Sequence, residues 1–218
     1  MTSVFVTGTD TGVGKTFISV ALIELLQQQG LTVSGMKPIA SGCEMTVEGL
    51  RNDDALKLSQ QSNVDLPYDL INPYAFEPAI APHIAAKQAG IEIELDKIQQ
   101  NYTLIKQQAD AVVVEGAGGW LVPLNNDQAM ADLAVLLDLP IILVVDIRLG
   151  CINHALLTVK AIETTGLKLQ GWVANHIEVT EQASEIIQTL TQQIVAPCLG
   201  SVPVLEPKQS AVDYLTFE

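Results

Sequence analysis

Positive charge is scarce in this sequence. Its 11 Lys and Arg residues stand against 25 Asp and Glu residues, which gives a formal net charge of -14. Binding to nucleic acid requires a basic surface that neutralises phosphates, so we expect no nucleic-acid partner. No apolar run approaches the length of a bilayer span, and the longest, residues 141–145, has the length of a strand. We therefore expect no membrane partner and interpret the acidic surplus as a solvated surface.

Cysteine is also rare. The three cysteines are Cys43, Cys151 and Cys198. They lie far apart and form no CxxC pair, which disfavours a disulfide framework or a zinc site and favours a reducing compartment. The histidines show no metal-ligand spacing either. The N-terminus enters the apolar residues 4–6 directly, without a basic segment or a cleavage site, so we predict no signal peptide and a cytoplasmic location.

Apolar residues make up 48% of the 218 positions, in short runs that alternate with amphipathic stretches. This alternation predicts an α/β fold, a mostly parallel sheet with helices on both faces, and without repeats or linkers we expect a single domain over residues 1–218. The expected strands are 4–7, 32–37, 111–114, 141–145, 169–174 and 198–202. The expected helices are 16–29, 53–60, 94–108, 129–137, 153–164 and 181–193. Most of 62–82, with its four prolines, is predicted to be loop.

A glycine-rich loop at residues 8–16 follows the first expected strand and opens the first expected helix. It matches the P-loop pattern except for one extra residue before Gly14-Lys15-Thr16. Glycines let backbone N–H groups point inward at phosphate oxygens, and the helix start adds its positive end. Lys15 supplies charge beside the transferred phosphoryl group and Thr16 a hydroxyl for Mg²⁺. The context predicts nucleotide binding on a P-loop NTPase-like fold.

Two acids and a lysine stand near other strand or helix ends. Glu115 follows the apolar residues 112–114 and resembles the acid that completes the metal site of such enzymes. Asp54 is a second candidate, although an acid at a helix start is often only an N-terminal cap or first-turn residue. Lys37 ends the second strand at the same sheet edge as the P-loop and could neutralise phosphoryl charge, or it could be a solvated lysine. Ser41 could hydrogen-bond a substrate.

Further segments make the sequence similar to one known family. They are 6–11, 13–16, 37–38, 41–42, 48–52, 54–55, 72–74, 114–120, 149–154 and 171–175. With these, nearly the whole chain to about Val204 resembles the dethiobiotin synthetases. The resemblance implies ATP- and Mg²⁺-dependent closure of the ureido ring of dethiobiotin, in biotin biosynthesis, from 7,8-diaminononanoate and CO₂. A carbamate and a carbamic–phosphoric anhydride would be the intermediates, and ADP and phosphate the other products.

The resemblance also implies roles for individual residues. Lys15 and Lys37 would be catalytic. The metal ligands would be Thr16, Asp54 and Glu115. Thr11 and Ser41 would contact the carbamate or the diamine, and a helix start formed by Gly150, Cys151 and Asn153 would receive the substrate carboxylate from a neighbouring subunit, which implies a homodimer with shared active sites. The nucleotide would contact Gly12, Val13, Gly14, Lys15, Thr16, Phe17, Asp54, Glu115, Gly116, Ala117, Gly118, Asn175, His176, Val204, Leu205 and Glu206.

The sequence departs from the family pattern at two positions, and two other functions remain as alternatives. Gly12 stands where some members of the family carry an acid, and His176 stands where an acid is frequent. One alternative is an amide-forming synthase of corrin biosynthesis, although those proteins usually carry a glutamine amidotransferase domain for which this chain is too short. The other is a nucleotide-switched partitioning ATPase, whose P-loop carries an early signature lysine where this chain has residues 9–11, Thr-Asp-Thr.

Overall fold

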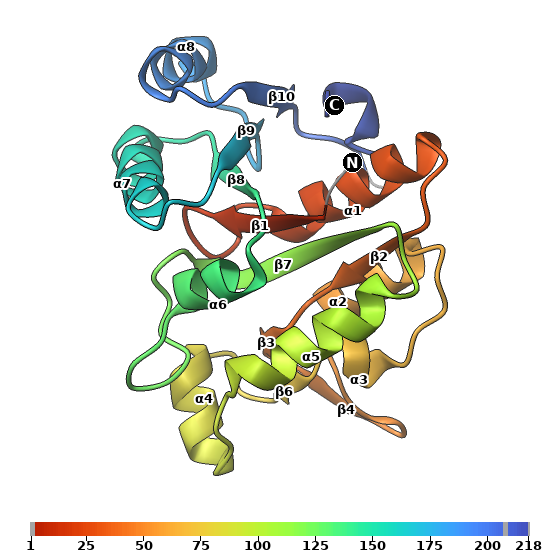
Figure 1. The fold of residues 1–218 in the computed structure, drawn as a ribbon. Helices are drawn as coiled ribbons and strands as arrows, with labels where there is room; N and C mark the ends of the chain where they lie inside the picture. Colours follow the sequence, from red (N-terminus) through yellow and green to blue (C-terminus); the bar gives the residue numbers. More distant parts are fainter. Residues whose placement is uncertain (1–2, 207–208, 218) are drawn as a thin grey trace.

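A computed structural model describes residues 3–206 and 209–217, so the ends of the expected domain at 1–2 and 218 lie outside it (Figure 1). The centre is a parallel sheet in the order β10-β9-β8-β1-β7-β2. Its strands are β1 (Val4–Gly8), β2 (Val33–Met36), β7 (Ala111–Gly119), β8 (Ile141–Asp146), β9 (Leu169–Asn175) and β10 (Cys198–Val202). The prediction of a parallel α/β sheet is confirmed.

Helices cover both faces of this sheet because its side chains alternate between two apolar layers. In β1, Val4 and Val6 pack with α1 (Lys15–Gln28) and α2 (Asp53–Gln61) on one face. Phe5 packs on the opposite face, and the helices of that face are α5 (Leu95–Lys106), α6 (Met130–Leu137), α7 (Cys151–Glu163) and α8 (Ala183–Gln193). Within the described ranges, no helix is both long and apolar enough to cross a bilayer.

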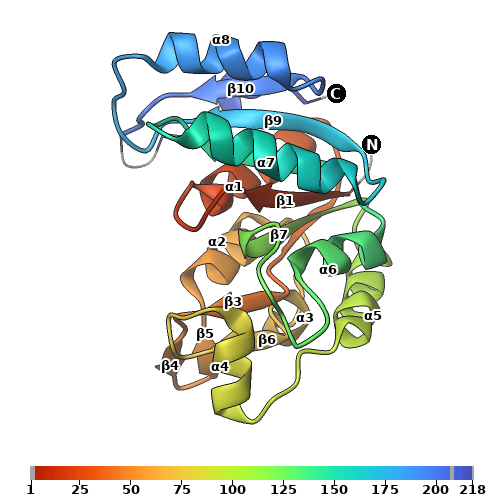
Figure 2. The ribbon, with the colours of Figure 1, turned by 90° about the vertical axis from the view of Figure 1, so that its left-hand side faces the viewer.

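Smaller elements gather beyond β2, at the end of the molecule opposite α8 and β10 (Figures 1 and 2). They are β3 (Ile39–Ser41), β4 (Glu44–Thr46), β5 (Gly49–Arg51), α3 (Tyr68–Ile71), β6 (Tyr74–Phe76) and α4 (Pro82–Ala89). Most of 62–82 is loop, as expected, but the stretch also contains α3 and β6, which were not expected. A strand as short as β6 shows no periodicity, and its pairing with β3 joins residues far apart in the sequence.

The other expected elements are present, β10 with the expected ends and the rest with shifted ends. The largest difference is β7, which was expected to end at residue 114 but continues to Gly119. Its neighbour β1 explains this, because Val6 pairs with Glu115 and Gly8 pairs with Gly119. Glu115 consequently lies inside the strand, opposite Val6, rather than at its end. The helix expected from residue 153 begins earlier, at Cys151.

The C-terminal residues 209–217 contain a short 3₁₀ helix, η1 (Val212–Tyr214), and pack against the apolar layer that includes α1. Phe217 accepts a hydrogen bond at its carbonyl from the Gln29 side chain at 3.1 Å. Ser210 donates its hydroxyl proton to Glu24 Oε2 at 2.6 Å. These contacts tie the tail to the helix that follows the P-loop.

Close packing at Gly35 in β2 gives a test of how α2 is held. A methyl group added there would lie 2.7 Å from Cβ of Leu58 in α2 and 3.0 Å from Cδ1 of Ile23 in α1. Gly35→Ala should therefore lower the free energy of unfolding by about 1–3 kcal/mol in urea denaturation. Gln60→Ala, at an exposed position of α2, should stay within about 0.5 kcal/mol of wild type. Equal stability of the two variants would contradict this packing.

Candidate active site

The loop between β1 and α1 has the shape expected of a phosphate-binding loop. Gly12 and Gly14 adopt left-handed backbone angles, with φ of 79° and 89°. Gly14 also lies against Asn175, because a Cβ at Gly14 would be 2.1 Å from the Asn175 amide nitrogen. That nitrogen donates a hydrogen bond to the carbonyl oxygen of Val13 at 2.9 Å. The last residue of β9 thus holds the curl of the loop, and glycine is required where the two approach.

Lys15 is a buried cation within this loop. Its ammonium donates to the carbonyl oxygen of Asp10 at 2.8 Å and makes no ion pair within 4 Å among the described residues. Burial, reinforced by the nearby positive charge of Lys37, lowers the pKa of Lys15 to about 8. A desolvated cation without a direct counter-ion favours an incoming anion, and a nucleotide phosphate has the required charge.

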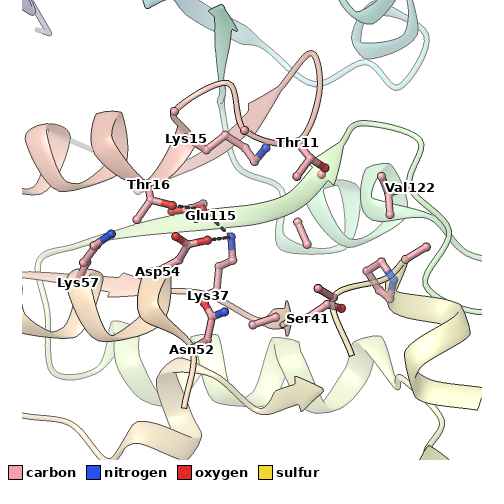
Figure 3. Close-up of a pocket in the computed structure, with 18 of the residues that line it drawn as sticks. Thr11, Lys15, Thr16, Lys37, Ser41, Asn52, Asp54, Lys57, Glu115 and Val122 are labelled. Atoms are coloured by element: carbon pink, nitrogen blue, oxygen red, sulfur yellow. Dashed lines mark hydrogen bonds and ion pairs between the residues drawn. The ribbon is translucent and has the colours of Figure 1, made fainter. Parts of the chain in front are cut away.

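Below the loop, four side chains from four elements meet (Figure 3). The Lys37 ammonium, just beyond the end of β2, lies 2.5 Å from Glu115 Oε1 in β7 and 3.4 Å from Asp54 Oδ2 in α2. The Thr16 hydroxyl, in α1, donates to the same Oε1 at 2.9 Å. Lys37 and Glu115 are 5% and 1% exposed, so the pair is almost entirely removed from water.

The electrostatics keep these groups charged. Burial by itself would lower the pKa of Lys37, but the Glu115 and Asp54 carboxylates outweigh it and raise the pKa above its ordinary value. Burial would likewise raise the pKa of Asp54, but the Lys37 charge holds it below its ordinary value. The structure therefore decides two open alternatives. Lys37 is no solvated surface lysine. Asn52 caps α2 by accepting the Ala55 N–H at 3.2 Å, so Asp54 is not the cap but an acid of the first turn, and it also contacts Lys37.

A cavity of about 670 Å³ opens beside these side chains. Of the residues singled out from the sequence, those that line it are Thr11, Gly12, Gly14, Lys15, Thr16, Phe17, Lys37, Ser41, Asp54, Glu115, Ala117 and Gly118. The lining residues that sequence reasoning missed are Ala40, Asn52, Lys57, Ala79, Ile80, Ala81, Pro82 and Val122. Residues 79–82 carry no chemical signal, and only the fold brings them here. Asn52 could have been found as the polar residue before the acids of α2.

Four of the remaining candidates contribute packing or hydrogen bonds near the loop and Lys37. Val13 is buried, and Gly116 offers its carbonyl oxygen to the Lys37 ammonium at 3.3 Å. Asn175 contacts the loop as described. His176 follows it and shares a hydrogen bond of 3.1 Å with Ser201, while burial lowers the pKa of its ring.

The other candidates lie outside the lining of this cavity, but beside the same carboxyl edge of the sheet. Residues 204–206 follow β10, with Leu205 packed against the α1 layer. Gly150 precedes α7 with a left-handed φ of 88°, and this helix start follows β8. Cys151 is buried there, whereas Asn153 is exposed. The structure thus groups these segments near one edge without bringing them into the cavity.

Two buried oxygen atoms at the site have no hydrogen-bond partner among the described residues. They are Glu115 Oε2 and Ser41 Oγ. A buried polar atom without a partner costs free energy, so each is suited to a ligand. The described part of the chain has no group of three or more His, Cys, Asp or Glu side chains able to hold a metal. A cation here would instead have two carboxylates and the Thr16 hydroxyl, a hard oxygen set that fits Mg²⁺.

A glycine loop between a parallel strand and a helix, with a buried lysine and a serine or threonine next to it, defines the class of P-loop nucleotide-binding proteins. Residues 2–211 match the model of a family described as AAA domain. The chain has 50% identity over 208 residues to "ATP-dependent dethiobiotin synthetase BioD" of Pseudomonas aeruginosa, covering 94% of this chain and 91% of the relative. The chain belongs to the family of ATP-dependent dethiobiotin synthetases.

Two further relatives agree with this. The proteins of the same printed name from Chromohalobacter salexigens and Cellvibrio japonicus are 49% and 51% identical, covering 100% and 92% of this chain and 98% and 89% of theirs. Among solved structures, the MinC:MinD cell division complex of Aquifex aeolicus is similar with a TM-score of 0.60 and 17% identity, over 95% of this chain and 83% of that one. At that identity the likeness shows the fold alone.

The buried pair predicts a large effect on stability. Lys37→Met should lower the free energy of unfolding by about 3–5 kcal/mol, because Glu115 would remain buried without its cation. Lys37→Met/Glu115→Gln removes both charges and should recover more than half of that loss. The measurement is urea denaturation at neutral pH without nucleotide or Mg²⁺.

The matched control is Lys57→Met, which breaks an ion pair with Asp53 of the same 2.5 Å length but with side chains 54% and 78% exposed. It should cost less than about 1 kcal/mol. A loss at Lys37 no larger than the loss at Lys57 would contradict the buried pair.

Proposed function

We propose that this protein closes the ureido ring of dethiobiotin from 7,8-diaminononanoate and CO₂, with ATP and Mg²⁺. The observation that carries the proposal is the convergence of two buried lysines and two carboxylates beside the P-loop, in a chain of this family. Lys15 and Lys37 face one cavity with Asp54 and Glu115. Such a site serves a reaction in which negative charge develops on a phosphoryl group.

The chemistry balances as follows. One amine of the substrate adds to CO₂, forming an N–C bond and losing a proton, which gives a carbamate. A carbamate oxygen then attacks the γ-phosphorus of ATP, and the bond to the β-phosphate oxygen breaks to release ADP. The second amine attacks the carbonyl carbon of the resulting anhydride. The C–O bond to phosphate breaks, phosphate and a proton leave, and the ring is closed.

The lysines supply charge to the phosphoryl transfer. Lys15 projects from the P-loop, whose N–H groups and following helix α1 favour phosphate. Lys37 keeps its charge because two carboxylates surround it. Both cations are fixed before the reaction and shielded from water, so charge that grows on the γ-phosphoryl oxygens meets them without reorganisation. We assign both lysines as catalytic residues.

Thr16, Asp54 and Glu115 would hold Mg²⁺. Their oxygen atoms suit a hard cation, and Glu115 Oε2 has no other partner among the described residues. When bound, the ion would reduce the negative charge of the phosphates that it contacts. Glu115 therefore serves both Lys37 and the metal, and its place inside β7 keeps it fixed.

The diamine substrate and the adenine base of ATP would occupy different parts of the site. Ser41 offers a buried hydroxyl without a partner in the described chain, and Thr11 lies on the cavity wall, so we assign both to the carbamate or the diamine. The apolar wall at 79–82 suits the alkyl chain of the substrate. The adenine base would lie toward Asn175 and His176, with residues 204–206 on its far side. Gly116, Ala117 and Gly118 would lie near the nucleotide.

We also propose a homodimer in which each site takes the substrate carboxylate from the start of α7 in the second subunit. Free N–H groups at a helix start favour an anion. Asn153 is exposed there, and Leu149, just before the helix, is 93% exposed in the single chain. Arg148 lies 3.0 Å from Asp146 and 3.7 Å from Asp10 of the P-loop, which fixes this segment beside the nucleotide site.

Phosphate release tests the reaction directly. With ATP and Mg²⁺ it should require the diamine and bicarbonate together, because the phosphoryl acceptor is a carbamate rather than water. Omitting any one of the four components should reduce the rate to background, and Lys37→Met/Glu115→Gln supplies the inactive control. Rapid hydrolysis with ATP and Mg²⁺ alone would overturn the proposal and favour a nucleotide-switched ATPase.

Mixing of inactive variants tests the shared site. Gly150 has a left-handed φ, so we choose Asn153→Asp, an exposed change that repels a carboxylate. Its partner is Lys37→Met/Glu115→Gln. In a heterodimer one site collects every lesion and the other none. Random exchange of equal amounts makes about half of the dimers mixed, so roughly a quarter of wild-type activity should return.

The control mixes Lys15→Ala with Lys37→Met/Glu115→Gln. Lys15, Lys37 and Glu115 of one site all come from the same chain. Every site in the mixed dimers therefore carries one of the two lesions, and no activity should return. All variants are first shown to be folded, dimeric and able to exchange subunits. Under those conditions, failure of Asn153→Asp to restore activity would mean that each site is built from one chain.

A further inference from the structure

Asn72 lies in a segment that the sequence resemblance contains but to which no role is assigned. It is 3% exposed and follows α3 directly. Its side-chain nitrogen donates to the carbonyl oxygen of Lys37 at 2.7 Å and to that of Tyr74 at 3.3 Å. The backbone adds another link, because the Lys37 N–H donates to the Ile71 carbonyl at 2.9 Å. The main chain of Lys37 is thus held on both sides by this segment.

The Tyr68 hydroxyl extends the contact to a second part of the site. It donates to Asn72 Oδ1 at 3.0 Å and accepts the backbone N–H of Asn52 at 2.8 Å. Donation to Asn72 needs the protonated hydroxyl, and burial raises the pKa of Tyr68 above its ordinary value, which keeps the proton in place. The Arg51 guanidinium lies over the Tyr68 ring, 4.2 Å from its centre, and fixes the ring plane.

These bonds connect two stretches of chain that carry reacting groups. Lys37 follows β2, and Asn52 caps the helix whose first turn holds Asp54. Between them the chain leaves the site through β3 and the β4–β5 hairpin, so the sequence alone does not fix their spacing. The links from Asn52 to Tyr68, from Tyr68 to Asn72 and from Asn72 to Lys37 form a continuous chain of hydrogen bonds across that gap.

We propose that Tyr68 and Asn72 are positioning residues, which set the main chain of Lys37 against that of Asn52 and so place the Lys37 ammonium between Asp54 and Glu115. This inference rests on the proposed function. Neither side chain lines the cavity. Their effect on the reaction is therefore carried by the geometry of Lys37 and Asp54, and small displacements of such groups slow phosphoryl transfer strongly.

The sharpest variant is Tyr68→Phe, because it removes one oxygen atom and leaves the ring under Arg51. The Asn52 N–H loses its acceptor and Asn72 loses a donor. We expect kcat for diamine-dependent phosphate release to fall at least tenfold, which corresponds to a displacement well under 1 Å. The KM for ATP should change less than about threefold, because the P-loop remains intact.

Tyr74→Phe is the matched control. The Tyr74 hydroxyl also accepts a backbone N–H, that of Glu94 at 2.9 Å, and Tyr74 is 5% exposed. The same atom is lost from the neighbouring element β6, but this bond leads away from Lys37 and Asp54. Tyr74→Phe should show a comparable loss of stability in urea denaturation and a kcat within twofold of wild type. A purely structural role of Tyr68 predicts the same behaviour for both variants.

Asn72→Asp is the second variant. It keeps the shape and the Oδ1 acceptor but loses the donor to the carbonyl oxygens of Lys37 and Tyr74, and it should show the same fall in kcat at little changed KM for ATP. Kinetics are measured at a temperature where urea denaturation shows each variant folded. If Tyr68→Phe does not fold, Asn72→Asp alone tests the positioning role. Wild-type protein is assayed first, since its inactivity would count against the proposed function instead. With an active wild type, folded variants that keep the kcat of Tyr74→Phe would overturn the positioning role.

Discussion

The ion pair between Lys37 and Glu115 is the constraint on which the site depends. Two charges this deeply buried are stable only when their geometry is good and further partners are present. Glu115 therefore sits within β7, between β1 and β2, and Thr16 donates to it from α1. Asp54 and Lys15 complete a set of two cations and two carboxylates around the cavity. Bound phosphates would unbalance this set, which is the physical reason that a divalent cation should accompany them.

The small elements beyond β2 help to meet that constraint, because they hold the chain that carries Lys37 and Asp54. The central sheet fixes Glu115 and the P-loop, but Lys37 and Asp54 lie on chain that leaves the sheet. The segment formed by α3 and β6 returns to this chain through Asn72 and through the pairing of β3 with β6. Residues 79–82, which follow, line the cavity. This part of the chain thus holds one side of the cluster formed by Lys37, Asp54 and Glu115 and supplies the apolar wall of the cavity.

Much of the architecture followed from local patterns. Apolar runs flanked by amphipathic stretches predicted every strand of the main sheet, because burial on both faces demands such runs. The expected loop over most of 62–82 is present, but α3 and β6 within it were not expected, and the expected end of a strand at residue 114 was wrong. β6 pairs with β3, which is distant in the sequence, and the extension of β7 to Gly119 pairs with Val6 and Gly8 of β1. In each case the deciding hydrogen bonds come from distant chain.

The candidate site also combines residues that local sequence predicted with residues whose role depends on tertiary contacts. The sequence by itself determined the phosphate loop, since Gly12, Gly14, Lys15 and Thr16 form a local motif whose chemistry follows from its residue types and its place between strand and helix. Tertiary structure decided that Lys37 is buried, that Asn52 rather than Asp54 caps α2, and that Asn72 reaches the main chain of Lys37. Local sequence sets backbone preference and chemistry, whereas desolvation and hydrogen-bond partners depend on which distant segments fold against a side chain.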